Sequence, residues 1–560
     1  MMAVSHLSRA SRSRSPISPL LLLLAVITTL FALASCTALA QTSPESPVDS
    51  ESEPHSEYAH HQVLRVFANP STSEPLASFI ANNHIDLWSD VAPLRSGHID
   101  LRVTRAQAAQ LTSGVLPPGT RTQVLVADVA KLISKVADDQ HQLVSLSDSD
   151  KDAKVDANAP AHQRLMAQFR IDSSFLTFKQ VGEYLNELQT AYPKLVSTSV
   201  IGKTYEERDL VAVRVGRLDK PAAPGKKRFG VMVLGGAHAR EWSSVSSTLM
   251  TIHSLVAEAV SGSARAVAVL DAFEFHFVPM ANPDGYEYSM NKDRLWRKNR
   301  QPIGHASCLG IDINRNWPFR WSSATRNNAN GNSTTTTSGT NAAQCDPTFP
   351  GTGPADAKET QALMSWIQSL RSSPSLQLTA MYDVHAYSQL WMYPHAFSCS
   401  TNLPNGDALQ RVSSKAAAAI KQVAGAQFTT GQICSTIYVA AGSMSDWAYE
   451  TLALPFAFAI ELSPGNSDPS GFLLPADKIA NVGREMVAGF LASVQEIGSM
   501  LGGDDWVKVT AAANAAEKGL EGGVSGVQKK EASSAMRPGG SMVIVALVAA
   551  AMTVLAMVSM

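Results

Sequence analysis

Apolar positions change their spacing along the 560-residue chain, and the longest regular region begins near Thr177. There, short runs that are apolar throughout alternate with longer segments whose apolar residues recur every three or four positions. The short runs predict strands buried on both faces, and the longer segments predict amphipathic helices. The expected strands are 211–215, 229–234, 273–278, 378–384 and 456–461, and the expected helices are 244–257, 357–370, 407–423 and 476–497. Thr177 can cap one further helix, which would bury Val181, Tyr184, Leu185 and Leu188.

This alternation predicts an α/β domain over residues 171–498, with a mixed, mostly parallel central sheet covered by helices on both faces. Ligands of such sheets collect at the carboxyl ends of the strands. Residues 316–344 interrupt the alternation with a stretch rich in Asn and Thr, which indicates a surface insertion.

A shorter region, residues 62–140, has a different pattern of brief alternating runs. It predicts a small α+β open sandwich that is large enough to fold alone. The expected strands are 63–67, 85–88, 99–103 and 122–125, and the expected helices are 76–83, 104–111 and 128–136.

Polar segments separate and flank these two regions. Residues 41–61 are rich in Ser, Pro and Glu and predict a disordered lead-in, and residues 499–540 predict a stalk. Residues 141–170 have the composition of a linker, and Arg164 and Arg170 near its end offer cleavage sites for a trypsin-like protease.

Both termini carry apolar stretches that predict targeting. Residues 1–40 combine early arginines, a short apolar run and an Ala-x-Ala site, as in a secretory signal peptide; a signal anchor is the alternative. Residues 541–560 form an apolar tail with small residues before it, which fits either a lipid-anchor signal or a retained membrane anchor. We therefore expect an exported protein, tethered to the cell surface through its C-terminus.

Composition narrows the partners and the compartment. The 46 Lys and Arg nearly balance the 48 Asp and Glu, so nothing suggests a nucleic-acid partner. An exported chain pairs its cysteines, and four remain after Cys36 leaves with the signal peptide. Three connectivities are open, and proximity in sequence favours Cys308 with Cys345 and Cys399 with Cys434. Asn332 lies in a glycosylation sequon.

Candidate metal ligands stand where two expected strands end. His238 and Glu241 follow the run 229–234, and His385 follows the run 378–384. Taken alone, His238 and Glu241 could be an ordinary surface pair, and His385 could be a structural histidine. Two histidines and one carboxylate together form the ligand set of a catalytic zinc site with an open position.

Three further side chains suit peptide chemistry. Glu461 interrupts the apolar run 455–462, and a buried carboxylate needs a metal, a base or a pocket rim beside it. The alternative is an ordinary strand-end Glu in water. Asn314 and Arg315 are adjacent and can grip a carboxylate, although a surface arginine is the default.

Together these residues resemble the zinc metallocarboxypeptidases of the carboxypeptidase A and B type. The resemblance runs from about residue 60 to 497 and includes an activation domain like theirs, over 62–140. The matching motifs, in chain order, are His238-Ala-Arg-Glu241, Asn282-Pro-Asp-Gly285, Arg294-Leu-Trp-Arg297, Asn314-Arg315-Asn316, His385-Ala-Tyr-Ser388, Thr436-Ile-Tyr438 and Glu461.

The resemblance implies a secreted, zinc-dependent exopeptidase made as a proenzyme, activated by a trypsin-like protease and monomeric. One zinc ion would be held by His238, Glu241 and His385, with Asp312 orienting His238. A zinc-bound water would attack the scissile carbonyl of the C-terminal peptide bond, with Glu461 as general base and Arg297 stabilising the oxyanion. Asn314, Arg315 and Tyr438 would bind the terminal carboxylate, and Arg240 and Tyr387 would contact the peptide further along.

Terminal-residue preference depends on Ser445, which stands where B-type enzymes carry an acid and A-type enzymes an apolar residue. The neighbouring residues Ile433, Ile437, Ala440, Met444 and Ala459 are apolar or small, which favours apolar or aromatic terminal residues. Two other hypotheses remain: an inactive, surface-tethered binding protein on a peptidase fold, and a zinc endopeptidase of wall peptides. The carboxylate-binding residues disfavour the endopeptidase.

Overall fold

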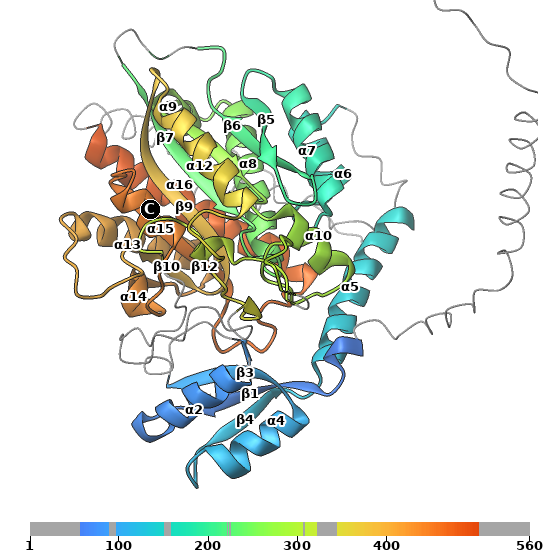
Figure 1. The fold of residues 1–560 in the computed structure, drawn as a ribbon. Helices are drawn as coiled ribbons and strands as arrows, with labels where there is room; N and C mark the ends of the chain where they lie inside the picture. The colour runs from blue at the N-terminus through green and yellow to red at the C-terminus, as the bar shows by residue number, and fades with distance from the viewer. Residues whose placement is uncertain are drawn as a thin grey trace, which may run out of the picture. The chain divides into compact units, whose positions relative to one another are not determined.

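The computed structural model describes residues 56–83, 85–88, 97–149, 158–220, 222, 226–305, 308–321 and 344–502 (Figure 1). Its centre is an eight-stranded sheet with the order β11-β10-β12-β9-β7-β8-β6-β5. These strands are β5 Val196–Lys203, β6 Asp209–Val215, β7 Arg228–Gly235, β8 Phe273–Val278, β9 Leu376–Ser388, β10 Leu390–Tyr393, β11 Thr429–Gln432 and β12 Phe456–Gly465.

Pairing within this sheet is mixed. The central strands β8, β7, β9 and β12 run parallel to one another, and β10 is parallel to β11. Antiparallel pairs join β10 to β12 and β8, β6 and β5 in turn. The mixed, mostly parallel sheet predicted from the sequence is confirmed.

Helices cover both faces of the sheet because neighbouring strand residues point to opposite sides. Val231 and Val233 of β7 belong to a core shared with α8 and α16, whereas Met232 and Leu234 belong to a second core shared with α12 and α15. The helices are α6 Ala161–Phe169, α7 Phe178–Ala191, α8 Trp242–Val260, α9 Ala264–Ala272, α10 Pro283–Asn291, α12 Lys358–Arg371, α13 Gly406–Ala424, α14 Ile433–Thr436, α15 Met444–Glu450 and α16 Ile479–Leu501, with 3-10 turns η3 Ile313–Arg315 and η4 Ala476–Lys478.

Every strand and helix expected after residue 170 is present. Thr177 caps α7 in a capping box with Gln180, and all four expected residues of its buried face are buried. Among the elements not predicted are β5, α9 and α10. β5 lies at the edge of the sheet and has few buried positions, which leaves only a weak apolar run in the sequence.

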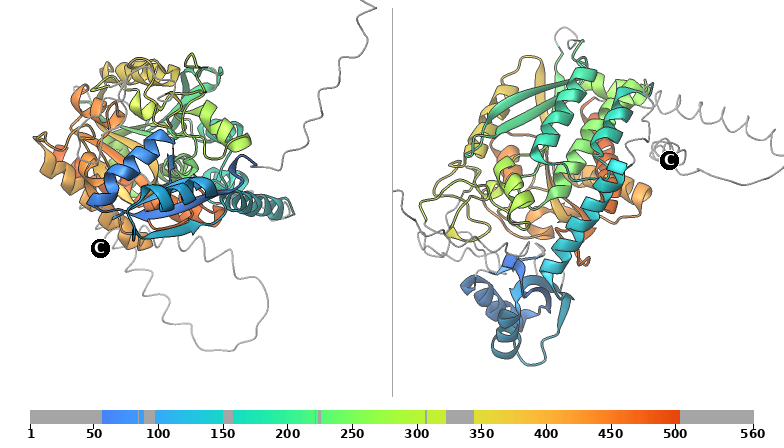
Figure 2. Two further views of the ribbon diagram at one scale, coloured as in Figure 1. Left: turned by 60° about the horizontal axis from the view of Figure 1, so that its bottom comes forward. Right: turned by 90° about the vertical axis from the view of Figure 1, so that its right-hand side faces the viewer.

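The N-terminal region forms a four-stranded antiparallel sheet in the order β2-β3-β1-β4. This region is drawn in blue to cyan in Figure 2. Its elements are η1 Ser56–Tyr58, β1 His61–Phe67, α2 Pro70–Asn82, β2 Asp86–Leu87, β3 His98–Thr104, α4 Arg105–Gln110, the π turn η2 Leu111–Val115, β4 Thr122–Val126 and α5 Val129–Ser149. Leu64 and Val66 of β1 pack with α2 and α4 in a core of their own. The predicted α+β sandwich is confirmed.

Helix α5 is longer than the sequence pattern predicted. The expected helix ends at 136, where its apolar spacing ends, but α5 continues to Ser149 because no Gly or Pro interrupts it. Helix α6 begins at Ala161, so helices occupy both ends of the predicted linker 141–170. Arg164 lies within α6, and Arg170 ends it in a left-handed conformation with φ 53°.

Both expected disulfides form. Cys308 pairs with Cys345 and Cys399 with Cys434, with Cα atoms 5.0 and 5.5 Å apart. The predicted signal peptide, most of the lead-in, Asn332, most of the stalk and the C-terminal tail lie outside the described residues. The first residues of the predicted stalk are instead the end of α16, which extends to Leu501. Within the described part of the chain, no helix is both long and apolar enough to cross a membrane.

Candidate active site

The turn after β7 presents the first two candidate ligands. Gly236 has φ 67°, and a Cβ there would lie 2.9 Å from Val245, so the sharp turn needs glycine. A Cβ on Gly235 would lie 2.6 Å from the Thr248 hydroxyl, so α8 packs close against this strand end. The chain then places His238 in the turn and Glu241 at the N-cap of α8, both buried.

His385 comes from β9, the neighbour of β7, and completes a triad with these two residues. Nδ1 of His238 lies 2.7 Å from Oε1 of Glu241 and 3.1 Å from Nδ1 of His385, which lies 3.1 Å from Oε2 of Glu241. Ligands about 2.0–2.1 Å from one tetrahedral ion lie roughly 3.3 Å apart. The three donors therefore fit a single small metal ion, as predicted.

Each histidine is oriented by a buried carboxylate on its other nitrogen. Nε2 of His238 lies 3.1 Å from Asp312, and Nε2 of His385 lies 2.8 Å from Asp383. Such carboxylates fix the tautomer that leaves Nδ1 able to bind metal. Burial alone would raise the pKa of Asp312, but Arg297 and His238 hold that pKa well below its ordinary value.

Arg297 lies beside the triad and is held by the same carboxylate. Its Nε and Nη2 donate to Oδ2 of Asp312 at 3.1 and 3.0 Å, and its Nη1 lies 3.9 Å from Glu241. The carbonyl of Arg297 accepts a hydrogen bond from the backbone amide of Ala239. This bond fixes the arginine to the turn that carries His238 and Glu241, called the ligand turn below. The Asn282 side chain donates to the carbonyl of Ala237 and fixes the same turn.

Glu461 lies on β12, directly across from His385 of β9 in the parallel register. It is 8% exposed and lines a pocket together with His238 and His385. The strand pairing thus brings the predicted base next to the metal ligands. Glu461 is therefore a buried pocket residue and not a solvated strand-end carboxylate.

The same pocket contains the predicted carboxylate-binding residues. Nη2 of Arg315 donates to the hydroxyl of Tyr438 at 2.8 Å, and its Nη1 donates to the carbonyl of Asn314. The Asn314 amide donates to Asp383 and accepts from the backbone of Met444, both at 2.9 Å. Partners within the α/β domain (residues 171–498, called the large domain below) therefore hold all three side chains in place.

The remaining pocket wall is apolar or small. Beside the polar residues named above, it consists of Met392, Ala396, Ile433, Ile437, Ala440, Ser443, Ser445 and Ala459. Met444, which the sequence also placed here, is buried in the adjoining core. Among the described lining residues, Glu461 is the one carboxylate.

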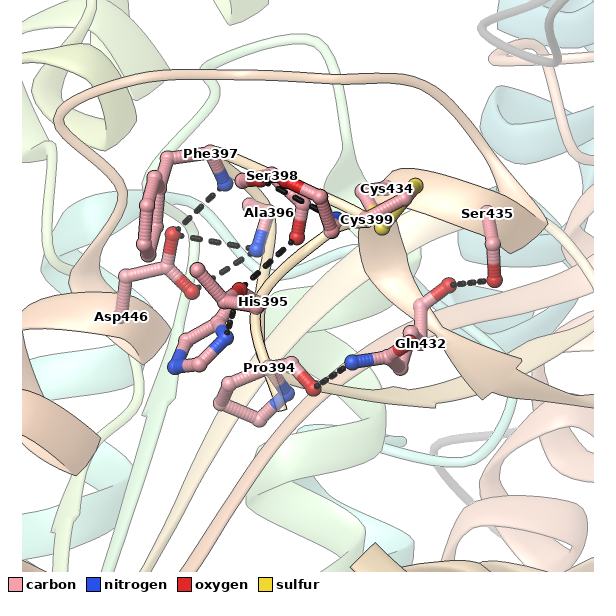
Figure 3. Close-up of a disulfide and its surroundings, with 12 residues drawn as sticks. Pro394, His395, Ala396, Phe397, Ser398, Cys399, Gln432, Cys434, Ser435 and Asp446 are labelled. Atoms are coloured by element: carbon pink, nitrogen blue, oxygen red, sulfur yellow. Dashed lines mark hydrogen bonds between the residues drawn. A yellow bond between two sulfur atoms is a disulfide. The ribbon is translucent and has the colours of Figure 1, made fainter. Parts of the chain in front are cut away.

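A second carboxylate near the pocket, Asp446, is used by the backbone. It accepts hydrogen bonds from the amides of Ala396 and Phe397, as Figure 3 shows beside the Cys399–Cys434 disulfide. Burial raises the pKa of Asp446 to about 6. The disulfide joins this segment to α14, whose Ile433 lines the pocket, so it holds two parts of the wall together.

Two predicted peptide contacts, Arg240 and Tyr387, are not among the residues that line the terminal pocket. Instead they contact the N-terminal sheet. Nη1 of Arg240 donates to both carboxylate oxygens of Asp86 at 3.0 and 2.8 Å. The hydroxyl of Tyr387 donates to the carbonyl of Trp88.

Sequence reasoning missed three residues of this site. Asp383 could have been found, since an Asp two positions before His385 lies on the same side of a strand. Asp86 and Phe472 gave no such signal. Asp86 is 154 positions from Arg240. Phe472 packs against Trp88 and Tyr387, which are also distant in the sequence.

Comparison with known proteins identifies the family of this chain. The family model described as zinc carboxypeptidase matches residues 181–489, which include every residue of the triad and of the pocket. The chain belongs to the zinc carboxypeptidase family.

Similar proteins carry two kinds of name within this zinc carboxypeptidase family. A "Metallocarboxypeptidase A-like protein" of Trichophyton verrucosum is 36% identical over 316 residues, covering 56% of this chain and 68% of its own. An "Inactive metallocarboxypeptidase ecm14" of Talaromyces stipitatus is 28% identical over 470 residues, covering 80% and 74%.

Solved structures share the fold. Carboxypeptidase A from Helicoverpa armigera matches with a TM-score of 0.64 at 22% identity, covering 79% of this chain and 99% of that one. Thrombin activatable fibrinolysis inhibitor matches with a TM-score of 0.61 at 22% identity, covering 78% and 99%. Both matches extend over more of the chain than the catalytic family model does.

Proposed function

We propose that this zinc carboxypeptidase family member is an active exopeptidase that hydrolyses the C-terminal peptide bond of peptides and proteins. The observation that carries the proposal is the common pocket of Glu461, the two histidine ligands and Arg315. Hydrolysis of a C-terminal peptide bond requires three things in one pocket. These are a metal that activates water, a base that accepts its proton and a cation that anchors the terminal carboxylate.

The pocket assigns a task to each side chain. Zinc, when bound by the triad, would supply a Lewis acid that activates water and polarises the scissile carbonyl. Arg315 and Tyr438 hold the terminal carboxylate and so select the last peptide bond. Glu461 accepts the proton of the attacking water and delivers it to the leaving nitrogen, while Arg297 stabilises the negative charge on the carbonyl oxygen.

The wall of the pocket supports a preference for apolar or aromatic terminal residues. A Lys or Arg side chain entering between Met392, Ile433 and Ala459 would lose water without meeting a facing carboxylate. Ser445 offers a hydroxyl but no charge.

The N-terminal sheet supports synthesis as a proenzyme. Asp86 and Trp88 contact residues that a longer peptide substrate would reach, and a trypsin-like cut near Arg164 or Arg170 would separate the two regions. We further propose that the protein is exported, N-glycosylated at Asn332, tethered by its C-terminus and monomeric, as its sequence predicts.

The alternative is an inactive binding protein, which the names of several relatives favour. Against it, this chain keeps the triad, Arg297, Arg315 and Glu461, so no residue that the reaction needs is replaced. The sequence therefore provides no reason to transfer the word inactive to this chain.

The deciding experiment treats the purified full chain with trypsin and measures hydrolysis of blocked dipeptides ending in Phe, Leu or Arg. We expect release of Phe and Leu but not of Arg. Glu461→Gln should keep its zinc, measured by elemental analysis, and lose at least about 10²- to 10⁴-fold in kcat. A zinc-loaded, correctly cleaved protein with no activity would support the inactive alternative, and a preference for Arg would refute the apolar pocket.

A further inference from the structure

We propose that the peptide-binding surface next to the metal site recognises an acidic side chain upstream of the scissile bond, with Arg240 as the residue that selects it. The proposal rests on the exopeptidase activity proposed above and specifies its substrates as peptides with Asp or Glu near an apolar C-terminus. It is carried by the partners of Arg240.

Arg240 is buried, with 2% of its surface exposed, and its charge is met by the N-terminal sheet. Both oxygens of Asp86 accept from its Nη1. Among the described residues, its Nε is buried without a hydrogen-bond partner, and no acceptor of the catalytic region is bonded to its guanidinium. Once the N-terminal sheet leaves, the large domain retains a cation that lacks a carboxylate.

The surroundings of Arg240 favour a carboxylate over a neutral ligand. Its guanidinium stacks 3.9 Å from the ring centre of Phe472, which holds it in one plane. The nearby Arg294 donates to the Arg240 carbonyl and to that of Phe472, so a second buried cation lies behind the first. The two guanidinium groups make this surface electropositive, while the Phe472 ring holds Arg240 in place, and an anionic group would be stabilised there.

Asp86 shows which ligand geometry this surface accepts. Burial by itself would raise the pKa of Asp86, but Arg240 and Arg102 more than offset burial, and the pKa lies below its ordinary value. Two residues further on, Trp88 packs edge-on against Phe472, and its carbonyl accepts from Tyr387. The segment therefore binds through a carboxylate, an aromatic ring and a backbone carbonyl, all of which a peptide can supply.

Position relative to the terminal pocket indicates which part of a substrate would lie here. Arg315, Tyr438 and Ser445 enclose the terminal residue, and Arg240 is outside that pocket. Arg240 nevertheless lies between His238 and Glu241 in the ligand turn. A peptide whose last bond lies at the metal must therefore extend toward Arg240 with its upstream residues.

The test uses trypsin-treated protein and two pairs of blocked tripeptides that end in Leu. In each pair, Glu is compared with Gln, first at the residue before Leu and then one residue earlier. We expect kcat/KM to favour Glu by about tenfold or more in at least one pair, and 0.5 M salt to reduce the preference. Arg240→Gln should bring the Glu-to-Gln ratio near one, and Arg240→Lys should restore part of it.

The matched control is Arg411→Gln, an exposed arginine of α13 that should leave the ratio unchanged. Equal kcat/KM for Glu and Gln in both pairs would overturn the inference while leaving the exopeptidase proposal intact. If no peptide is hydrolysed, the proposed function fails, and calorimetric binding of the same peptides to cleaved Glu461→Gln protein still decides the inference. Equal Kd values for Glu and Gln in that assay would refute it.

Discussion

Two arginines near the candidate metal site differ in where their partners come from. Arg315 donates to Tyr438 and to the carbonyl of Asn314, which both belong to the large domain. Arg240 donates to Asp86, which belongs to the N-terminal sheet. Both are buried in the intact chain, so each needs a polar partner there.

This difference separates two sites, a preformed one around Arg315 and one around Arg240 that the N-terminal sheet covers. The partners of Arg315 lie outside the N-terminal sheet, so the proposed carboxylate anchor should keep its geometry when that sheet leaves. The positive charge of Arg240 is paired with a carboxylate only while that sheet covers it, or when another carboxylate replaces Asp86. Changes on the Arg315 side should therefore affect every substrate, and changes on the Arg240 side should affect latency and substrate choice.

The largest effect is expected from Arg315→Gln. Losing the charge that anchors the terminal carboxylate should lower kcat/KM by about 10²- to 10³-fold for every substrate, Glu-containing or not. Steady-state kinetics of the cleaved enzyme measures it. Tyr438→Phe is the matched control and should cost about tenfold or less, because it removes one neutral hydroxyl. A loss confined to acidic peptides would contradict the assignment of Arg315.

Asp312→Asn should weaken the preformed side through the metal. Because Asp312 orients His238 and binds Arg297, its neutral replacement should lower zinc affinity by about 10- to 100-fold. Competition with a chelator of known affinity measures the change. Asp383→Asn should behave similarly, whereas Asp271→Asn, at an exposed carboxylate, should not. Unchanged zinc affinity in both variants would remove these carboxylates from the metal site.

Asp86→Asn should affect the covered side. Without the carboxylate, Arg240 loses its charged partner, and the N-terminal sheet should cover the site about tenfold less tightly. In the uncleaved chain, with Arg164→Gln and Arg170→Gln removing the two predicted cleavage sites, activity on a blocked dipeptide should rise by a similar factor. Asp128→Asn, at a partly exposed carboxylate directly before α5, serves as control. Equal activity of the two variants would show that this ion pair does not maintain latency.

The smallest effect concerns pH. Arg240 and Arg102 depress the pKa of Asp86 in the folded protein, so its contribution is present above the unfolded pKa of about 3.9 and is lost as pH falls below that value. Retention of the N-terminal fragment after cleavage should therefore stay constant between about pH 5 and 8 and decrease only below about pH 4. In Asp86→Asn protein the acid-dependent decrease should shrink. Release that increases from pH 5 to 8 would point to a different titrating group.

Local pattern predicted the preformed side well. His238, His385 and Glu461 each follow or interrupt an apolar run, and β7, β9 and β12 are neighbours whose carboxyl ends meet. Side chains at such ends converge because parallel strands end at the same edge of the sheet. The metal triad therefore needed no knowledge of distant contacts.

The covered side could not be predicted in this way. The pairing of Asp86 with Arg240 depends on how two separately packed sheets meet, and no periodicity records that contact. The length of helix α5 was also missed, for a different reason. The apolar spacing that predicts a helix ends at Val136, although the helix continues to Ser149. Contacts between regions and polar helix extensions both lie outside what local patterns encode.

One consequence of the Asp86–Arg240 pair concerns concentration. A cut near Arg164 or Arg170 breaks a peptide bond and leaves every contact of this pair in place. What the cut changes is the effective concentration of the N-terminal sheet at its site, which is roughly millimolar for a short tether. Afterwards the same contacts form only as often as the bulk concentration of the released fragment allows. Activation of this protein is thus expected to be completed by dilution.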